Sequence, residues 1–169
     1  AWFERNALFD QISRVRRSNG MDTHLNYDSS GSLTSFTDAL GQTYSLTYDA
    51  HGQPLSLTDP LGNVTTLQYN AHGQVISMTD PLSRIYQMSY DAAGRLTSVT
   101  NPAGHASTRQ YDALNRMTAI LDALDGRTTY TYDANSRPTQ MQQATLMATL
   151  AYDARNRRTR LTLPNGVFT

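Results

Sequence analysis

The chain has no cysteine and no lysine, and Glu4 is its only glutamate. Without cysteine it can form neither a disulfide bond nor a thiolate metal site. Its 14 arginines balance 14 acidic residues, and this zero net charge argues against a surface for nucleic acid or anionic lipid. No apolar run approaches the roughly 18 residues of a membrane span. Thr, Ser, Tyr, Asp and Gly are frequent instead, a composition typical of strands and turns.

An internal repeat organises the sequence. A tyrosine followed by Asp or Asn recurs every 21 residues, with a last interval of 20, at Tyr27, Tyr48, Tyr69, Tyr90, Tyr111, Tyr132 and Tyr152. The residues that follow are Asp28, Asp49, Asn70, Asp91, Asp112, Asp133 and Asp153. Four residues after the tyrosine come Gly31, Gly52, Gly73 and Gly94, and later Asn115, Ser136 and Asn156. Signatures with a fixed period identify a tandem array.

Each unit contains two turn signals, which predict one β-hairpin per repeat. In Tyr-Asp-x-x-Gly, the Asp side chain can bond to the turn backbone, and Gly or Asn readily adopts a positive φ. In Asp-Pro-Leu-Gly, Pro fixes φ at the second turn position and Gly closes the turn. This inter-strand turn is represented by Gly41, Asp59, Pro60, Gly62, Asp80, Pro81, Pro102 and Gly104, with Ser83 in one unit and Gly126 one place late in another. About seven residues lie between successive turns, a usual strand length.

The second strand of each unit alternates cleanly, whereas the first does not. Tyr44, Leu46 and Tyr48 share one face, and the residues between them are polar. In the first strand, apolar residues occur six and nine places after the tyrosine, and on a straight strand these two positions would point to opposite faces. Either a β-bulge intervenes or the residue at the sixth place belongs to the turn. Pro54 and Pro138 at that place favour the turn, because Pro is poorly tolerated inside a paired strand.

We expect residues 1–169 to form a single array of about eight repeats. Residues 1–20 form a degenerate first repeat, in which only Asn6 and Gly20 keep the register. The rows of Tyr and Leu would create an apolar face far larger than the few hundred Å² that a soluble monomer usually exposes. Repeat arrays cover such a face by stacking, so we interpret the chain as a fragment of a larger shell.

Residues 141–151 depart from the pattern, because they lose one residue and the turn signal. They could form a short helix. Tyr152 is nevertheless nearly in phase, which favours an eroded repeat that keeps its strand–turn–strand form.

The Tyr-Asp signature, the 21-residue spacing and the Gly-Arg-Leu start of the first strand at residues 94–96, with looser forms at 31–33 and 73–75, resemble the RHS/YD repeats. These repeats occur in bacterial Rhs polymorphic toxins, in the C component of insecticidal toxin complexes and in animal teneurins. The resemblance implies an all-β fold: tandem hairpin repeats in a coiled antiparallel strip, a segment of a hollow β-shell. Many bacterial members also carry a segment with aspartyl self-cleavage chemistry. The Asp-Pro pairs here lie in ordinary turns and offer no candidate for it.

The resemblance implies a structural wall segment, without catalytic residues or cofactor, that encapsulates a toxic C-terminal effector for delivery to competing or host cells. Its partners would be the remaining repeats of the shell and the enclosed toxin, with secretion-apparatus proteins or chaperones besides. The protein would be bacterial, loaded in the cytoplasm before export, and secreted or delivered at the cell surface. An adhesion or carbohydrate-binding module of a cell-surface protein is the alternative, because the tyrosine column could stack on sugars.

Other side chains were candidates for chemistry. His51 and His72 could hold a metal with turn aspartates, but their spacing matches no compact ligand set. The Asp column offers one carboxylate per turn, which suits turn capping better than calcium binding. The tyrosines are expected to pack as a ladder along the sheet. We expect loose ion pairs across the turn for the arginines four residues after an Asp, which are Arg95, Arg116, Arg137 and Arg157.

Overall fold

Strands form where the sequence alternates, and a turn separates each strand from the next. The computed structural model describes residues 2–5, 10–16, 18–19 and 22–168. Its strands are β1 (Trp2–Arg5), β2 (Ile12–Arg16), β3 (Asp22–Tyr27), β4 (Leu33–Thr37), β5 (Thr43–Tyr48), β6 (Pro54–Thr58), β7 (Val64–Tyr69), β8 (Val75–Thr79), β9 (Ile85–Tyr90), β10 (Leu96–Thr100), β11 (Ala106–Tyr111), β12 (Met117–Leu121), β13 (Arg127–Tyr132), β14 (Pro138–Gln143), β15 (Leu146–Tyr152), β16 (Arg158–Leu163) and β17 (Gly166–Phe168). Asn6 and Gly20, predicted to keep the register of the first repeat, lie outside the described residues.

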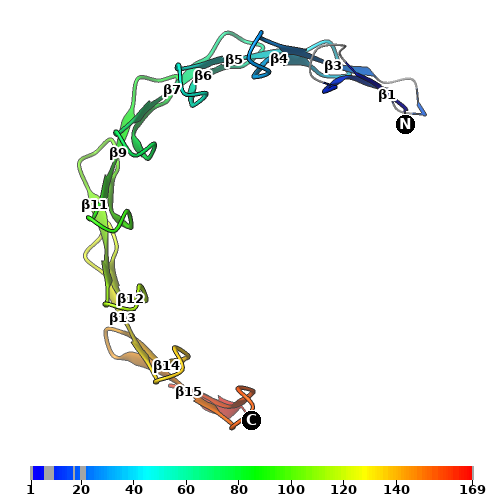
Figure 1. The fold of residues 1–169 in the computed structure, drawn as a ribbon. Helices are drawn as coiled ribbons and strands as arrows, with labels where there is room; N and C mark the ends of the chain where they lie inside the picture. Colours follow the sequence, from blue (N-terminus) through cyan, green and yellow to red (C-terminus); the bar gives the residue numbers. More distant parts are fainter. Residues whose placement is uncertain (1, 6–9, 17, 20–21, 169) are drawn as a thin grey trace. The chain divides into compact units, whose positions relative to one another are not determined.

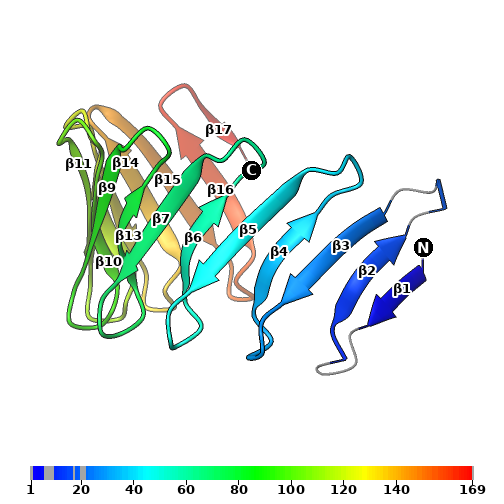
Figure 2. The same ribbon diagram turned by 90° about the horizontal axis from the view of Figure 1, so that it is seen from above.

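The chain divides into two compact units, residues 1–85 and 86–169. In the first unit β1 to β8 pair antiparallel in chain order, as Figure 2 shows for the strands nearest the N-terminus. In the second unit β9 to β17 pair in the same way. The predicted all-β fold of tandem antiparallel hairpins is thus confirmed. The described residues contain no helix that could cross a membrane.

Each unit is a single layer of strands, and its described residues form no hydrophobic core. In the edge-on view of Figure 1, no second layer covers either face of the strip within a unit. Ala119 and Ala148, which are 5% and 8% exposed, are the only hydrophobic residues that are buried in the described part of the chain. Leu61 and Leu124, at the tips of turns, are each 87% exposed. Stability therefore comes from contacts between neighbouring strands.

A β-bulge interrupts the first strand of each repeat. Pro54 pairs with Tyr48 and Ser56 pairs with Thr47, so Leu55 bulges out of the ladder between them. The same shift recurs in the other repeats. The turn interpretation of the sixth place was therefore wrong, because that residue pairs with the tyrosine. Pro is accepted there since it opens the strand beside the bulge.

The bulge resolves the conflict between the sixth and ninth places of the first strand. Leu33 lies opposite Tyr27, and Phe36, three residues on, lies opposite Leu25. Because Leu25 and Tyr27 are two residues apart, all four side chains share one face. Phe36 also stacks on the next strand, with its ring centroid 4.6 Å from that of Tyr44. One face of the strip therefore carries rows of Tyr, Leu, Met and Phe.

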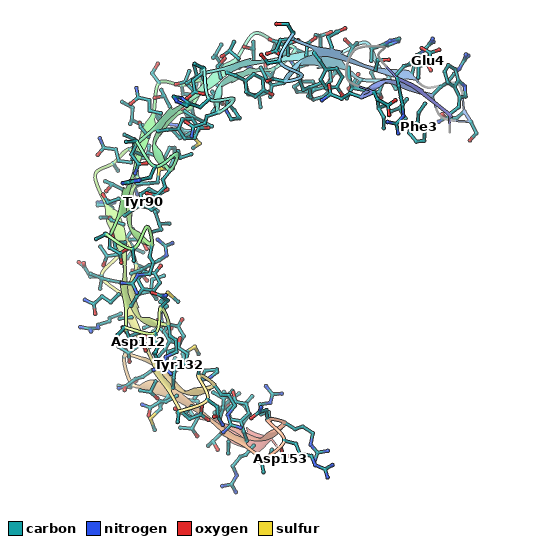
Figure 3. The ribbon with its side chains drawn as sticks, in the orientation of Figure 1. Phe3, Glu4, Tyr90, Asp112, Tyr132 and Asp153 are labelled. Atoms are coloured by element: carbon teal, nitrogen blue, oxygen red, sulfur yellow. The ribbon has the colours of Figure 1, made fainter. Side chains whose placement is uncertain are left out.

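The opposite face carries mainly Thr, Ser and Gln, and in β5, β7 and β9 its side chains are the more exposed. In β5 the exposed and half-buried residues alternate strictly, with Tyr44, Leu46 and Tyr48 half-buried. Phe3 and Glu4, neighbours in β1, project to opposite sides of the sheet in Figure 3. The faces thus follow the period of two that the sequence predicts.

Residues 141–151 form two strands joined by a short loop. β14 and β15 pair up to Gln143 and Leu146, which leaves Ala144 and Thr145 as the connection. Ala144 has a φ of 49°. The helix considered for this segment is therefore absent, and the lost residue shortens the loop without breaking the alternation of strands.

Candidate functional site at the Tyr-Asp turns

The Tyr-Asp turns share one hydrogen-bond pattern. In the turn after Tyr27, Asp28 donates its N–H to the carbonyl of Ser32 at 3.0 Å, and Gly31 donates to the carbonyl of Asp28 at 3.1 Å. Oδ1 of Asp28 accepts the N–H groups of Ser30 and Ser32 at 2.8 and 2.9 Å. Each carboxylate therefore caps its own turn, which is the role that the single Asp per turn suggests.

The residue four places after the tyrosine has a positive φ in every described turn of this row: Gly31, Gly52, Gly73, Gly94, Asn115, Ser136 and Asn156. At the opposite edge the Asp-Pro-Leu-Gly turns repeat the pattern, with positive φ at Gly41, Gly62, Ser83, Gly104 and Asp125. In the last of these the left-handed residue is Asp125 and not Gly126, because the turn keeps its register. Pro60, Pro81 and Pro102 occupy the second position of their turns. No backbone hydrogen bond of the turn is donated from that position, so a residue without an N–H is accepted there.

Each Tyr-Asp turn joins two strands into a hairpin, such as β3 with β4, and successive hairpins separate at the Tyr-Asp edge. The β4–β5 ladder contains only three pairs, from Ser35 with Ser45 to Thr37 with Thr43, all beside the opposite turn. At the Tyr-Asp edge the Tyr48 hydroxyl instead donates to the carbonyl of Leu33 at 2.8 Å. The tyrosine thereby bonds to a backbone carbonyl that lies beyond the end of the β4–β5 ladder.

This contact recurs along the described part of the chain with distances of 2.7–2.9 Å, and the tyrosines that make it include Tyr27, Tyr48, Tyr69, Tyr111, Tyr132 and Tyr152. Each hydroxyl donates to the residue that begins the preceding strand. The tyrosine column is thus a hydrogen-bonded link between repeats as well as a packed row.

In the second unit, arginines bridge successive turns. Arg116 donates from Nε to Oδ2 of Asp112 at 2.7 Å, and from Nη1 to the carbonyl of Asp133 in the next turn at 3.1 Å. Its guanidinium carbon lies 4.8 Å from the centroid of the Tyr132 ring. Asp112, Tyr132 and Asp153 follow one another along this unit in Figure 3. The arginine therefore ties its own carboxylate to the backbone and ring of the next repeat.

Arg95 and Arg137 repeat these contacts, and their Nη1 atoms also reach the side-chain oxygens of Asn115 and Asn156 at 2.9 Å. The side chains of Arg95, Arg116 and Arg137 are 22–27% exposed, whereas that of Arg157 is 71% exposed. The ion pair within the turn is the one that the sequence predicts, at 2.6–2.7 Å in all four cases. The contact to the next turn escaped sequence reasoning.

In the first unit, Gln or Ser stands in place of Arg. Gln11 donates from Nε2 to the carbonyl of Gly31 in the next turn at 2.9 Å. A Cβ atom on Gly73 would lie 2.6 Å from Nε2 of Gln53, so the amide fills the space that a side chain at position 73 needs. The glutamine amide therefore occupies space beside the glycine of the following turn, while an arginine uses an amide or hydroxyl there.

The sequence contains this relation in every repeat. The residue five places after the tyrosine position pairs with the left-handed residue of the next turn in Gln11–Gly31, Ser32–Gly52, Gln53–Gly73, Gln74–Gly94, Arg95–Asn115, Arg116–Ser136 and Arg137–Asn156. Gln or Ser always precedes Gly, and Arg always precedes Asn or Ser. This covariation was the signal that could have revealed the contact between turns.

The turn geometry stabilises the ionised aspartates. The backbone N–H of Arg116 is the main cause that lowers the pKa of Asp112, with the arginine side chain adding to it against the opposing effect of burial. The pKa values of Asp91 and Asp133 are lowered for the same reasons, with the backbone N–H of the arginine in the turn again as the main cause. At the opposite edge, the Arg84 side chain is the main cause that lowers the pKa of Asp80.

The two histidines considered for metal binding lie at one groove of the first unit. His51, His72, Asp49 and Tyr69 line this groove, which has a volume of about 620 Å³. His51 Nδ1 lies 3.8 Å from Oδ2 of Asp49. Among the described residues, no three His, Asp or Glu side chains are placed to hold a metal ion together.

A double-mutant cycle tests the pairing of residues 53 and 73. Gly73→Asn is expected to lower the free energy of unfolding by about 1 kcal/mol more than Gly52→Asn, because only at position 73 does the new Cβ meet a glutamine. Gly52 is the matched control, since its φ of 79° is close to the 76° of Gly73 and a Cβ there has no atom within 4 Å. Adding Gln53→Arg to the Gly73→Asn chain should restore roughly 1 kcal/mol of the free energy of unfolding. Urea denaturation gives the free energy of unfolding of each variant. If the effects of the substitutions at positions 53 and 73 were strictly additive, the pairing would be refuted.

Acid should destabilise the chain in a window set by the turn aspartates. Because their folded pKa values lie below the ordinary value of about 3.9, their contribution is complete above that pH and is lost as pH falls through the folded values. Replacing Asp91, Asp112 and Asp133 by Asn should reduce the fall of the urea denaturation midpoint as the pH decreases through this window. Asn70 shows that the fold accepts Asn there, since its Oδ1 takes the N–H groups of His72 and Gln74. An unchanged pH dependence of the midpoint in this variant would contradict the role given to the turn aspartates.

Comparisons with known proteins identify the repeat. The RHS repeat family profile matches five overlapping segments, residues 27–64, 48–85, 69–108, 90–126 and 111–145. No curated protein matches the chain. Among solved structures, the fold is similar to TcdB2-TccC3 without hypervariable C-terminal region, with 20% identity and a TM-score of 0.72. It is also similar to TcdB2-TccC3-Cdc42, with 20% identity and a TM-score of 0.74.

A third similar structure is the Tc holotoxin pore of Photorhabdus luminescens with a TccC3 mutation, at 19% identity and a TM-score of 0.74. Each likeness covers 99% of this chain and 10% of the other, so the chain spans about a tenth of the length of those proteins. At this identity the structures show the shared fold, and the profile matches show the family. Since these matches extend without a gap from residue 27 to residue 145, the chain belongs to the RHS repeat family.

Proposed function

We propose that this chain is a wall segment of an RHS-type β-shell that surrounds a polypeptide. The observation that carries the proposal is a sheet one layer thick, in which Ala119 and Ala148 are the only buried hydrophobic residues of the described chain. A protein that folds around its own core cannot leave rows of Tyr, Leu and Met half-buried on one face. A wall can, because further repeats or an enclosed polypeptide cover that face.

The turn edges support the same proposal. Leu40, Leu61 and Leu82 recur every 21 residues at turn tips in the first unit, and they are 73–87% exposed. Consecutive hairpins are about 10 Å apart in a sheet, so these leucines form a row along one edge. Such a row suits an edge that packs against a neighbouring part of the same wall.

The enclosed polypeptide is, in this proposal, a toxic C-terminal effector domain that the shell carries to competing or host cells. The similarity to TccC3-containing structures, one of which lacks a hypervariable C-terminal region, supports this choice of cargo. The protein would be bacterial, loaded in the cytoplasm before export, and then secreted or delivered at the cell surface. Its partners would be the other repeats of the shell, the effector, and secretion-apparatus proteins or chaperones. The repeats themselves would need no cofactor and perform no catalysis.

The tyrosines already make contacts within the protein, and this argues against the carbohydrate-binding alternative. Their hydroxyls donate to backbone carbonyls, and guanidinium groups cover the rings of Tyr111, Tyr132 and Tyr152. A sugar would have to displace these contacts before it could stack on the same rings.

Protease protection tests the proposal. In the complete gene product, the domain that follows the repeats should resist a protease that rapidly digests the same domain expressed alone. Imaging of the same protein should show a hollow particle with an antiparallel strip in its wall. Equal digestion of the free and attached domains, or a solid particle without a cavity, would contradict the proposal.

A further inference from the structure

The three arginine contacts of the second unit show how this fold holds a guanidinium group between two Tyr-Asp turns. In each, the group meets the carboxylate of one turn, the first carbonyl of the next turn and the ring of the next tyrosine. The guanidinium carbon lies 4.7–4.8 Å from the ring centroid, within the range of a cation–π contact. Together these groups define a guanidinium site.

The groove of about 620 Å³ in the first unit lies at the equivalent place, between the turns that begin at Asp49 and Asn70. It is open because Gln53 stands where the second unit has arginine, and because Gly73 has no side chain. The shorter Gln53 side chain turns toward Gly73, with Nε2 at 2.6 Å from the position of a Cβ there. The groove therefore retains space at its carboxylate and its tyrosine.

Three elements of the guanidinium site are present in this groove. Oδ1 of Asp49 caps its turn, while Oδ2 lies 3.8 Å from the His51 ring, beyond hydrogen-bond length. The carbonyl of Asn70 accepts one N–H within its turn, from Gly73, just as that of Asp112 accepts one from Asn115 beside its arginine. Tyr69 lines the groove and keeps its hydroxyl bond to the carbonyl of Pro54. Burial raises the pKa of Tyr69, and the nearby charge of Asp49 raises it further.

We propose that this groove binds an arginine side chain of another polypeptide. The guanidinium would donate to Oδ2 of Asp49 and to the carbonyl of Asn70 while covering the Tyr69 ring, as the arginines of the second unit do in their own turns. Leu55 and Leu67 also line the groove, and the aliphatic part of the side chain can pack against them. The planar guanidinium fork matches this set of acceptors, whereas the compact ammonium group of lysine does not.

An NMR titration of the full chain tests the proposal. N-acetyl-L-arginine methylamide, added at pH 7.5 and low salt, should shift the backbone amides of Gln53, His72 and Gly73 in a saturable manner. The lysine derivative should bind at least about fivefold more weakly, because it offers neither the fork nor the flat cation. Guanidinium chloride should also bind more weakly than the arginine derivative, since it has no aliphatic part. Equal binding of guanidinium would overturn the assignment to a polypeptide side chain.

Variants separate the site from general charge attraction. Asp49→Asn keeps the Oδ1 acceptor of the turn, as native Asn70 does, and should weaken arginine binding at least about fivefold. Asp38→Asn removes the same charge at the opposite edge, where Oδ1 caps an equivalent turn, and should leave binding unchanged. Gln53→Arg should abolish binding with the fold retained, because its own guanidinium would occupy the groove. Equal loss in the Asp49 and Asp38 variants, or full binding by the Gln53→Arg chain, would refute the site.

Discussion

The structure depends on closing the gap between successive Tyr-Asp turns. The backbone ladders between successive Tyr-Asp hairpins end before this edge: between β4 and β5 only three residue pairs form, and all lie beside the opposite turn. Side chains take over at this edge: a tyrosine hydroxyl meets the carbonyl that begins the preceding strand, and Gln or Arg reaches the next turn. Without these contacts one edge of the strip would hold only within single hairpins.

Local links of this kind explain how the described residues can be ordered although only Ala119 and Ala148 among their hydrophobic side chains are buried. Each repeat is stabilised by its neighbours, as in other one-dimensional arrays, and does not need a shared core. Two forms of the link occur in this chain, a glutamine against glycine and an arginine against asparagine or serine. Because neither form needs a second layer, the strip leaves one apolar face free. That free face is what makes a wall segment of a shell the function that fits the fold best.

The period, the hairpins and both turn rows could be predicted from sequence, because their causes are local. Asp bonds to its own turn and Gly adopts a positive φ whatever lies beyond the repeat. The bulge was harder, since Pro54 looks like a turn residue until its pairing with Tyr48 is known. Arg116 was harder still, because its partners Tyr132 and Asp133 lie 16 and 17 residues away, in another turn. Its signal lay in the covariation between repeats, which a scan of single turns does not reveal.

The most direct test of the link between turns compares Arg116→Gln with Arg157→Gln by urea denaturation of the 169-residue chain. Both arginines pair with the Asp of their own turn, but Arg116 is 22% exposed and holds the next turn, while Arg157 is 71% exposed. The account predicts that Arg116→Gln lowers the free energy of unfolding by about 1 kcal/mol and that Arg157→Gln has a much smaller effect. Equal effects of the two substitutions would contradict it.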